Sequence, residues 1–147
     1  MMDSLGAFIG EWSMDAPAFQ GPPGRATFEW MPGGKFLVER WDAGTIRVGE
    51  EDIEFTGIAI VGFDSAKQNY LQHYFDSRGV ARVYQMSFTD GVWKLWRETE
   101  DFSRLDFSQR FTGTFSDDGK SIAGRWDISH DGSTWEKDFD LTFKRIA

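Results

Sequence analysis

The sequence predicts an all-β protein: a single domain over residues 1–147, folded as an antiparallel up-and-down β-barrel of about ten strands. Aromatic residues make up 16% of the chain, and strands favour them. Turn sequences rich in glycine recur at nearly regular intervals, as expected for a series of hairpins. No segment sustains the helical period, apart from a short turn before Trp12. A meander without covering helices must form two sheets or a barrel, and we favour the barrel because closure removes unpaired edges.

Turn sequences divide the chain into the predicted strands. Asp-Gly between alternating runs is the strongest short-range hairpin signal, because both central residues of a type I′ turn need a positive φ. The turn sequences are MPGGK (31–35), FDSAKQ (63–68), FDSRGV (75–80), FTDGVW (88–93), FSDDGK (115–120) and SHDGST (129–134). The predicted strands span about 10–15, 25–31, 35–42, 54–62, 68–76, 80–89, 92–99, 107–115, 120–129 and 134–145.

Composition removes several classes of function. The chain has no cysteine, which excludes a disulfide framework, a thiolate nucleophile and a cysteine-ligated metal site. A formal net charge of −8 argues against nucleic acid and anionic lipid as partners. We expect no membrane span, since no apolar stretch approaches 18 residues. The first residues lack the basic and apolar regions of a signal peptide, so a cytoplasmic location is expected.

The direction of each side chain follows from the register of the hairpins. A two-residue turn at Asp90-Gly91 gives one hairpin face that reads Tyr84, Met86, Phe88, Trp93, Leu95 and Arg97. An Asp131-Gly132 turn is expected to set Ile128 against Trp135, Gly124 against Phe139 and Ile122 against Leu141. The SDDG turn places Phe107, Gln109, Phe111 and Phe115 on one face with Ile122, Gly124, Trp126 and Ile128. Large apolar residues share this face, which is therefore the predicted lumen.

The direction of His73 depends on the turn that follows it. A four-residue DSRG loop would pair His73 with Arg82 and point both into the lumen. A three-residue turn with a glycine bulge at Gly79 would reverse the parity, placing Tyr70, Gln72 and Tyr74 inside and His73 outside. We favour the first register, because it gives the more apolar inner face.

The candidate ligand-binding residues are the polar groups of this predicted lumen, together with one tryptophan. An arginine cannot lose its charge and is costly to bury unpaired, so it requires an anion from a ligand or from the protein. The internal alternatives are Glu39 and Asp42, with Arg40 and Lys137 as further possible lumen residues. The candidates are His73, Arg82, Tyr84, Arg97, Gln109 and Trp126.

The segment FIGEW (8–12) carries the Gly-x-Trp pattern of the calycins, a superfamily of lipocalins, fatty-acid-binding proteins and nitrobindin-like barrels. In lipocalins this tryptophan lies at the barrel floor beneath a basic residue of the last strand, which here would be Arg145 or Lys144. The chain most resembles bacterial lipocalin-like families of unknown function. Fatty-acid-binding proteins hold a carboxylate with an Arg-x-Tyr pair and a further arginine, and RVY (82–84) with Arg97 is similar in chemistry though not in position.

Two functions from different classes remain open. The first is a non-catalytic barrel, monomeric or homodimeric, that binds a small hydrophobic or amphipathic organic acid in its lumen. The second is an enzyme such as an isomerase or decarboxylase, with His73 or Tyr84 as general acid and base. No catalytic group or metal site is predicted. We expect no cofactor. The resemblance to nitrobindin-like proteins implies haem bound through a histidine near the C-terminus, but TWEKDFDLTFKRI contains none. Haem bound through His73 is the alternative.

Overall fold

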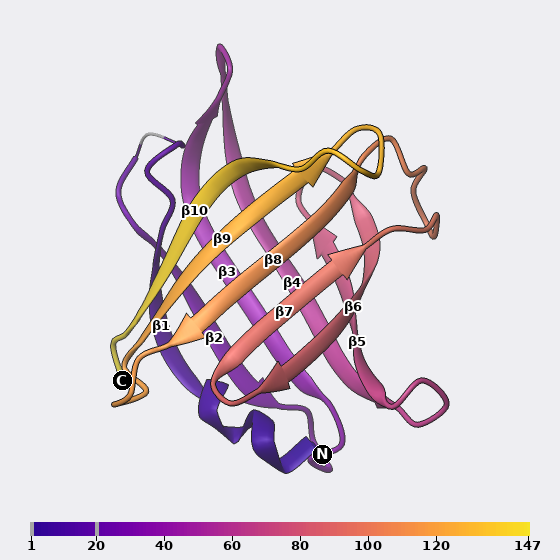
Figure 1. Cartoon of the computed structure of the whole chain (residues 1–147). Helices are drawn as coiled ribbons and strands as arrows, with labels where there is room; N and C mark the ends of the chain where they lie inside the picture. Colours follow the sequence, from indigo (N-terminus) through magenta and orange to yellow (C-terminus); the bar gives the residue numbers. More distant parts are fainter. Residues whose placement is uncertain (1, 20) are drawn as a thin grey trace.

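The computed structural model describes residues 2–19 and 21–147. Within this part of the chain, ten strands form one closed antiparallel barrel in the order β1-β10-β9-β8-β7-β6-β5-β4-β3-β2 (Figure 1). Each strand pairs with its neighbours in sequence, and β1 closes the barrel against β10. The predicted all-β, up-and-down barrel is confirmed.

The element bounds lie within a few residues of the predicted ones, except in one hairpin. The strands are β1 (Gly10–Asp15), β2 (Gly24–Trp30), β3 (Leu37–Val48), β4 (Glu51–Asp64), β5 (Asn69–Asp76), β6 (Ala81–Thr89), β7 (Val92–Arg97), β8 (Ser108–Phe115), β9 (Ser121–Ser129) and β10 (Glu136–Arg145). A short 3-10 helix, η1 (Met2–Phe8), precedes them. The exception is the β3–β4 hairpin, which continues past the predicted ends at 42 and 54 to a turn at Gly49. A bulge between Asp42 and Thr45 interrupts its register.

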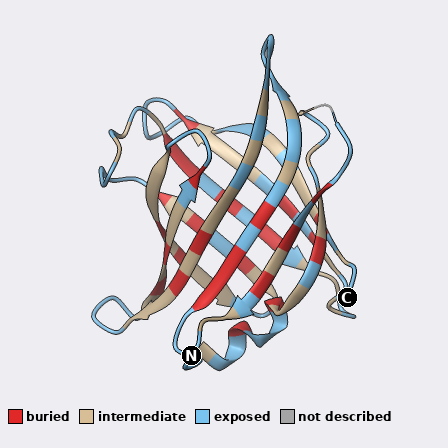
Figure 2. Ribbon diagram, turned by 180° about the vertical axis from the view of Figure 1, so that it is seen from behind, coloured by how far each residue is buried: buried red, intermediate tan, exposed pale blue. Residues whose placement is uncertain are grey.

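One end of the barrel is closed by η1, which lies across the lower end in Figure 1. Its Leu5 and Phe8 are fully buried. The Phe8 ring lies 5.0 Å from the rings of Phe88, Trp93 and Phe115, measured between centroids. Buried positions alternate with exposed or half-buried ones along the strands (Figure 2). An aromatic cluster therefore fills this end of the barrel, against η1.

The tryptophan of the FIGEW segment has the contact that the calycin resemblance implies. Trp12 is fully buried and pairs in register with Arg145 of the last strand. The guanidinium of Arg145 lies 4.1 Å from the centre of the Trp12 ring. Its two Nη atoms donate hydrogen bonds to the carbonyl oxygens of Ile9 and Ala7, both at 2.7 Å. Arg145 therefore ties the last strand to the end of η1, whereas the neighbouring Lys144 is exposed.

Replacing Arg145 with alanine is expected to lower the free energy of unfolding by about 2 kcal/mol, because a cation–π contact and two hydrogen bonds are lost. Urea denaturation monitored by tryptophan fluorescence measures this change. Lys144→Ala is the matched control, with an expected change below about 0.5 kcal/mol at an exposed position. Equal effects of the two substitutions would contradict this function of Arg145.

The registers predicted from Asp-Gly turns are confirmed in one hairpin and wrong in another. Phe88 pairs with Trp93 and Met86 with Leu95, as predicted. In the β9–β10 hairpin, however, Ile128 pairs with Glu136 rather than Trp135. Beyond a bulge between Lys137 and Phe139 the error grows to two residues: Gly124 pairs with Leu141 and Ile122 with Phe143.

A longer turn after β9 causes the first residue of this shift, and the bulge adds the second. The Asp131 carboxylate accepts hydrogen bonds from the backbone N–H groups of Ser133 and Thr134, at 2.8 and 2.7 Å. It therefore organises a wider loop than a two-residue turn. The predicted inner face survives, because the shift of two residues preserves parity, and Gln109 still pairs with Ile128 across β8 and β9. Lys137 is exposed and forms an ion pair with Asp140, so it is not a lumen residue.

Candidate functional site

A cavity of about 360 Å³ lies inside the barrel above the aromatic floor. Trp93, Phe111 and Phe143 form this floor, and Trp93 in turn contacts Phe8 of η1. The β3–β4 hairpin extends at the end of the barrel opposite η1 (Figure 1), and its Ile46 lines the cavity. The lining is mainly aromatic and aliphatic, as is typical of sites for small organic molecules.

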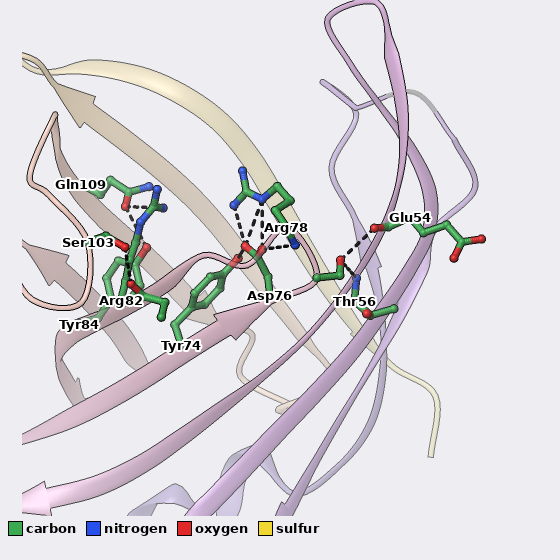
Figure 3. A network of polar contacts seen from close by, with 11 residues as sticks. Glu54, Thr56, Tyr74, Asp76, Arg78, Arg82, Tyr84, Ser103 and Gln109 are labelled. Carbon is green, nitrogen blue, oxygen red and sulfur yellow. Dashed lines mark hydrogen bonds and ion pairs between the residues drawn. The ribbon is translucent and has the colours of Figure 1, made fainter.

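Three polar side chains meet on one side of the cavity. Arg82 and Tyr84 project inward from β6, and Gln109 from β8. The Tyr84 hydroxyl donates a hydrogen bond of 2.9 Å to Oε1 of Gln109, and Nη1 of Arg82 donates one of 3.3 Å to the same oxygen (Figure 3). Burial raises the pKa of Tyr84, so this phenol stays protonated and acts as a hydrogen-bond donor.

The positive charge of Arg82 is not neutralised by any carboxylate among the described residues. Its guanidinium lies 5.4 Å from the centre of the Phe107 ring. Its Nε atom is buried and has no hydrogen-bond partner within residues 2–19 and 21–147. A buried donor on a cation that lacks an anion is an energetically costly arrangement. The guanidinium of Arg82 is thus a cation on the cavity wall with no anionic partner among the described residues.

The second arginine of the cavity, Arg78, is neutralised. Its Nη2 lies 2.7 Å from Oδ2 of Asp76, and the Tyr74 hydroxyl donates to the same oxygen at 2.7 Å (Figure 3). Burial raises the pKa of Asp76, but hydrogen bonds from Arg78 and Tyr74 outweigh it, so the pKa is lowered. Asp76 is therefore ionised and balances Arg78. The attractive charge of the cavity comes from Arg82.

Glu39 is a second polar group without a partner in the cavity. It projects from β3 into the lumen and is only 7% exposed. No side chain or backbone group of the described residues donates a hydrogen bond to its carboxyl group. Burial raises the pKa of Glu39 to about 8, so the carboxyl group is uncharged at neutral pH. The alternatives Arg40 and Asp42 are both exposed and do not enter the lumen.

The favoured register for His73 is wrong, and the alternative with a bulge at Gly79 is the observed one. Tyr74, not His73, pairs with Arg82, and His73 pairs with Val83. The turn is closed by the Asp76 carboxylate, which accepts a hydrogen bond of 2.8 Å from the backbone N–H of Arg78. Gly79 follows with a φ of +84°, the geometry of a glycine bulge.

His73 consequently lies on the outer face of the barrel. It lines a surface depression of about 180 Å³ with Phe36, Ile60 and Leu71. Tyr70, Gln72 and Tyr74 occupy the inner face of β5 instead, and Gln72 and Tyr74 line the cavity. The predicted proximity of His73 to the arginines is therefore not observed.

Arg97 is buried but faces a protein carboxylate, not the cavity. Its Nε and Nη2 donate to the two oxygens of Asp101 at 2.8 and 2.9 Å, and Nη2 also donates to the carbonyl of Ser103. Trp126 does line the cavity, with its ring 5.6 Å from Tyr84 and 5.1 Å from Phe111. Of the six predicted residues, the structure brings Arg82, Tyr84, Gln109 and Trp126 together.

The structure also bears on metal binding and membrane insertion. Among residues 2–19 and 21–147 there is no group of three or more His, Asp or Glu side chains that could hold a metal ion. In the same part of the chain, no helix is long and apolar enough to cross a membrane.

Comparison with known proteins gives a similarity of fold. No protein-family model matches the chain, and no curated protein does. Among solved structures, the crystal structure of Rv2717c from M. tuberculosis superposes with a TM-score of 0.62. The match covers 99% of this chain and 97% of that one, with 12% sequence identity. It shows a shared barrel architecture over the whole length.

Proposed function

We propose that this protein binds a hydrophobic or amphipathic organic acid inside its barrel. The observation that carries the proposal is Arg82: a cation with a buried, unpartnered Nε, in a cavity walled mainly by apolar side chains. The barrel architecture and a volume of about 360 Å³ are compatible with a small organic ligand. The calycin resemblance, including the Trp12–Arg145 contact, agrees with such a function.

The polar side chains and the apolar wall would hold different parts of the ligand. A carboxylate matches the fork of the Arg82 guanidinium, and the Tyr84 hydroxyl offers a second donor beside it. Gln109, whose Oε1 now accepts from both donors, would release one or both of them. The apolar part of the molecule would pack against Trp126, Leu95 and the floor.

Replacing Arg82 with methionine is expected to weaken binding of a fluorescent fatty-acid analogue at least tenfold, since a hydrogen bond to a charged group contributes about 1.5–3 kcal/mol. Fluorescence titration of the purified protein measures the change in Kd. The methyl ester of the probe, which has no charge, should bind the wild-type protein weakly and the variant equally weakly.

Arg110→Met is the matched control for this experiment. Arg110 is on the outer face of β8, where it stacks over Trp135 at 3.8 Å from the ring centre and pairs with Glu98. Its loss should leave the affinity for the probe unchanged. The proposal would be wrong if Arg82→Met and Arg110→Met bound the probe equally well, or if the wild-type protein took up no probe.

The enzymatic alternative has no specific observation in its favour. Its proposed acid and base was His73, which is on the outer face. The other candidate, Tyr84, has a raised pKa because of burial, which makes it a poor base at neutral pH. For the same geometric reason, His73 could not ligate a haem placed in this cavity. Binding is therefore the function we propose.

A further inference from the structure

Glu39 is held in the lumen wall by a strand whose neighbours offer it nothing polar. In register it pairs with Phe28 of β2 and Ala59 of β4, both buried. A carboxyl group at such a position costs free energy even when uncharged, unless it is hydrogen-bonded. No such bond is provided within the described residues, and the carboxyl group faces the cavity. The bonding capacity of Glu39 is therefore available to a bound molecule.

Glu39 and Arg82 are separate binding points on one wall. The register Glu39–Ala59, Ala59–Tyr74 and Tyr74–Arg82 places them in a single row across β3 to β6. Three strand spacings correspond to roughly 14 Å along the wall, and the curvature of the barrel shortens the direct path. Because β4 and β5 separate them, we assign the two groups to different polar atoms of a ligand. A molecule that satisfies both needs two polar groups.

The charge state of Glu39 selects the chemistry of the second group. The cavity is also lined by Asp15, Tyr74, Arg78, Arg82, Tyr84 and Asp138. Arg78 is neutralised by Asp76, and the positive charge of Arg82 is on the far side of Ala59 and Tyr74. Burial keeps Glu39 protonated, with a pKa of about 8. A protonated carboxyl group donates one hydrogen bond and accepts another, which suits an uncharged hydroxyl or carbonyl group.

We propose that Glu39 binds a hydroxyl or carbonyl group of the ligand, so that the molecule held in the barrel is an oxygenated fatty acid with its carboxylate at Arg82. This inference rests on the proposed function, since it assigns the carboxylate to Arg82. It adds that Glu39, a residue outside the Arg82–Tyr84–Gln109 cluster, makes the protein prefer ligands that carry a hydroxyl or carbonyl group.

Competitive displacement of a fluorescent fatty-acid analogue tests the inference. The competitors are octanoic, decanoic and dodecanoic acids and the ω-hydroxy derivative of each. For at least one chain length, the wild-type protein should bind the hydroxy acid about tenfold more tightly than the plain acid. Glu39→Leu should abolish this preference and leave the affinity for the plain acid unchanged or higher. Glu39→Gln, which keeps a donor and an acceptor, should retain most of it.

Glu29→Leu is the control, because Glu29 is exposed on the adjacent strand and pairs with Arg40. It should keep the wild-type preference, and thermal melting confirms that each variant is folded. If plain and hydroxy acids bind the wild-type protein equally at every length, the inference fails while the proposed function stands. If Glu39→Leu still prefers the hydroxy acid as the wild-type protein does, the inference likewise fails and the proposed function stands. If no acid binds, both the inference and the proposed function fail.

Discussion

Asp101→Ala is expected to lower the free energy of unfolding by about 3–5 kcal/mol, the cost typical of leaving a buried charge without its partner. The partner is Arg97, whose side chain is 2% exposed. Chemical denaturation followed by far-ultraviolet circular dichroism and tryptophan fluorescence measures the change. The effect should be among the largest of any polar substitution in the barrel.

The large expected loss of stability follows from the number of hydrogen bonds that the Asp101 carboxylate accepts. Asp101 accepts a two-pronged hydrogen bond from Arg97, and its oxygens also accept from the backbone N–H groups of Val83 and Ser103, at 2.7 and 3.0 Å. Burial raises the pKa of Asp101, but these bonds outweigh it and lower the pKa to about 2. The carboxylate therefore anchors the β7–β8 connection to β6.

Two further variants isolate the buried charge from other effects. Glu98→Ala removes the exposed pair with Arg110 and should cost less than about 1 kcal/mol. The double variant Arg97→Met with Asp101→Ala should recover much of the loss, because the uncompensated cation is removed with its anion. If Asp101→Ala and Glu98→Ala were equally mild, the pair would not have the stabilising effect that its burial implies.

The barrel could be predicted from the sequence because its signals are local. Alternation and Asp-Gly turns act within one hairpin, as the confirmed pairing of Phe88 with Trp93 illustrates. The errors occurred where an aspartate side chain reshaped the turn. Asp76 and Asp131 each bond to backbone N–H groups ahead of them, which changes the loop length and thus the register. The Asp-x-x-Gly pattern of 76–79, typical of a turn followed by a glycine bulge, could have indicated the correct direction of His73.

The candidate site was predictable only where side-chain direction follows from a regular hairpin. Arg82 and Tyr84 are on the inner face in both registers considered for β5, because β6 is fixed by its pairing with β7. The partner of Arg97 is in an irregular loop, and no periodicity places a residue such as Asp101. Glu39 could not be assigned to a face because a bulge between Asp42 and Thr45 separates it from the tight turn at Gly49, so the parity set by that turn does not carry to residue 39. Only tertiary structure shows that it is buried.

Glu39→Gln is expected to stabilise the protein strongly at alkaline pH and little at acidic pH. The pKa of Glu39 is about 8 in the folded protein, against 4.5 as its ordinary value. Between these values the folded state binds more protons than the unfolded state, so stability falls as pH rises. The penalty is absent below pH 4.5, grows from there to about pH 8 and is complete above it. The two pKa values correspond to a penalty on the order of 5 kcal/mol.

Denaturation of the wild-type protein and Glu39→Gln at intervals from pH 4.5 to 9 measures the penalty as a difference. Groups common to both proteins, such as Asp101 and Asp138, cancel in this difference. The two proteins should be equally stable within about 1 kcal/mol near pH 4.5, diverge by about 1.4 kcal/mol per pH unit up to about pH 8, and keep a constant difference above it. Glu29→Gln, at an exposed site, should follow the wild-type curve throughout. Parallel curves for the wild-type protein and Glu39→Gln would mean that Glu39 ionises in the cavity without cost, for which the lumen would have to supply it with water or a cation.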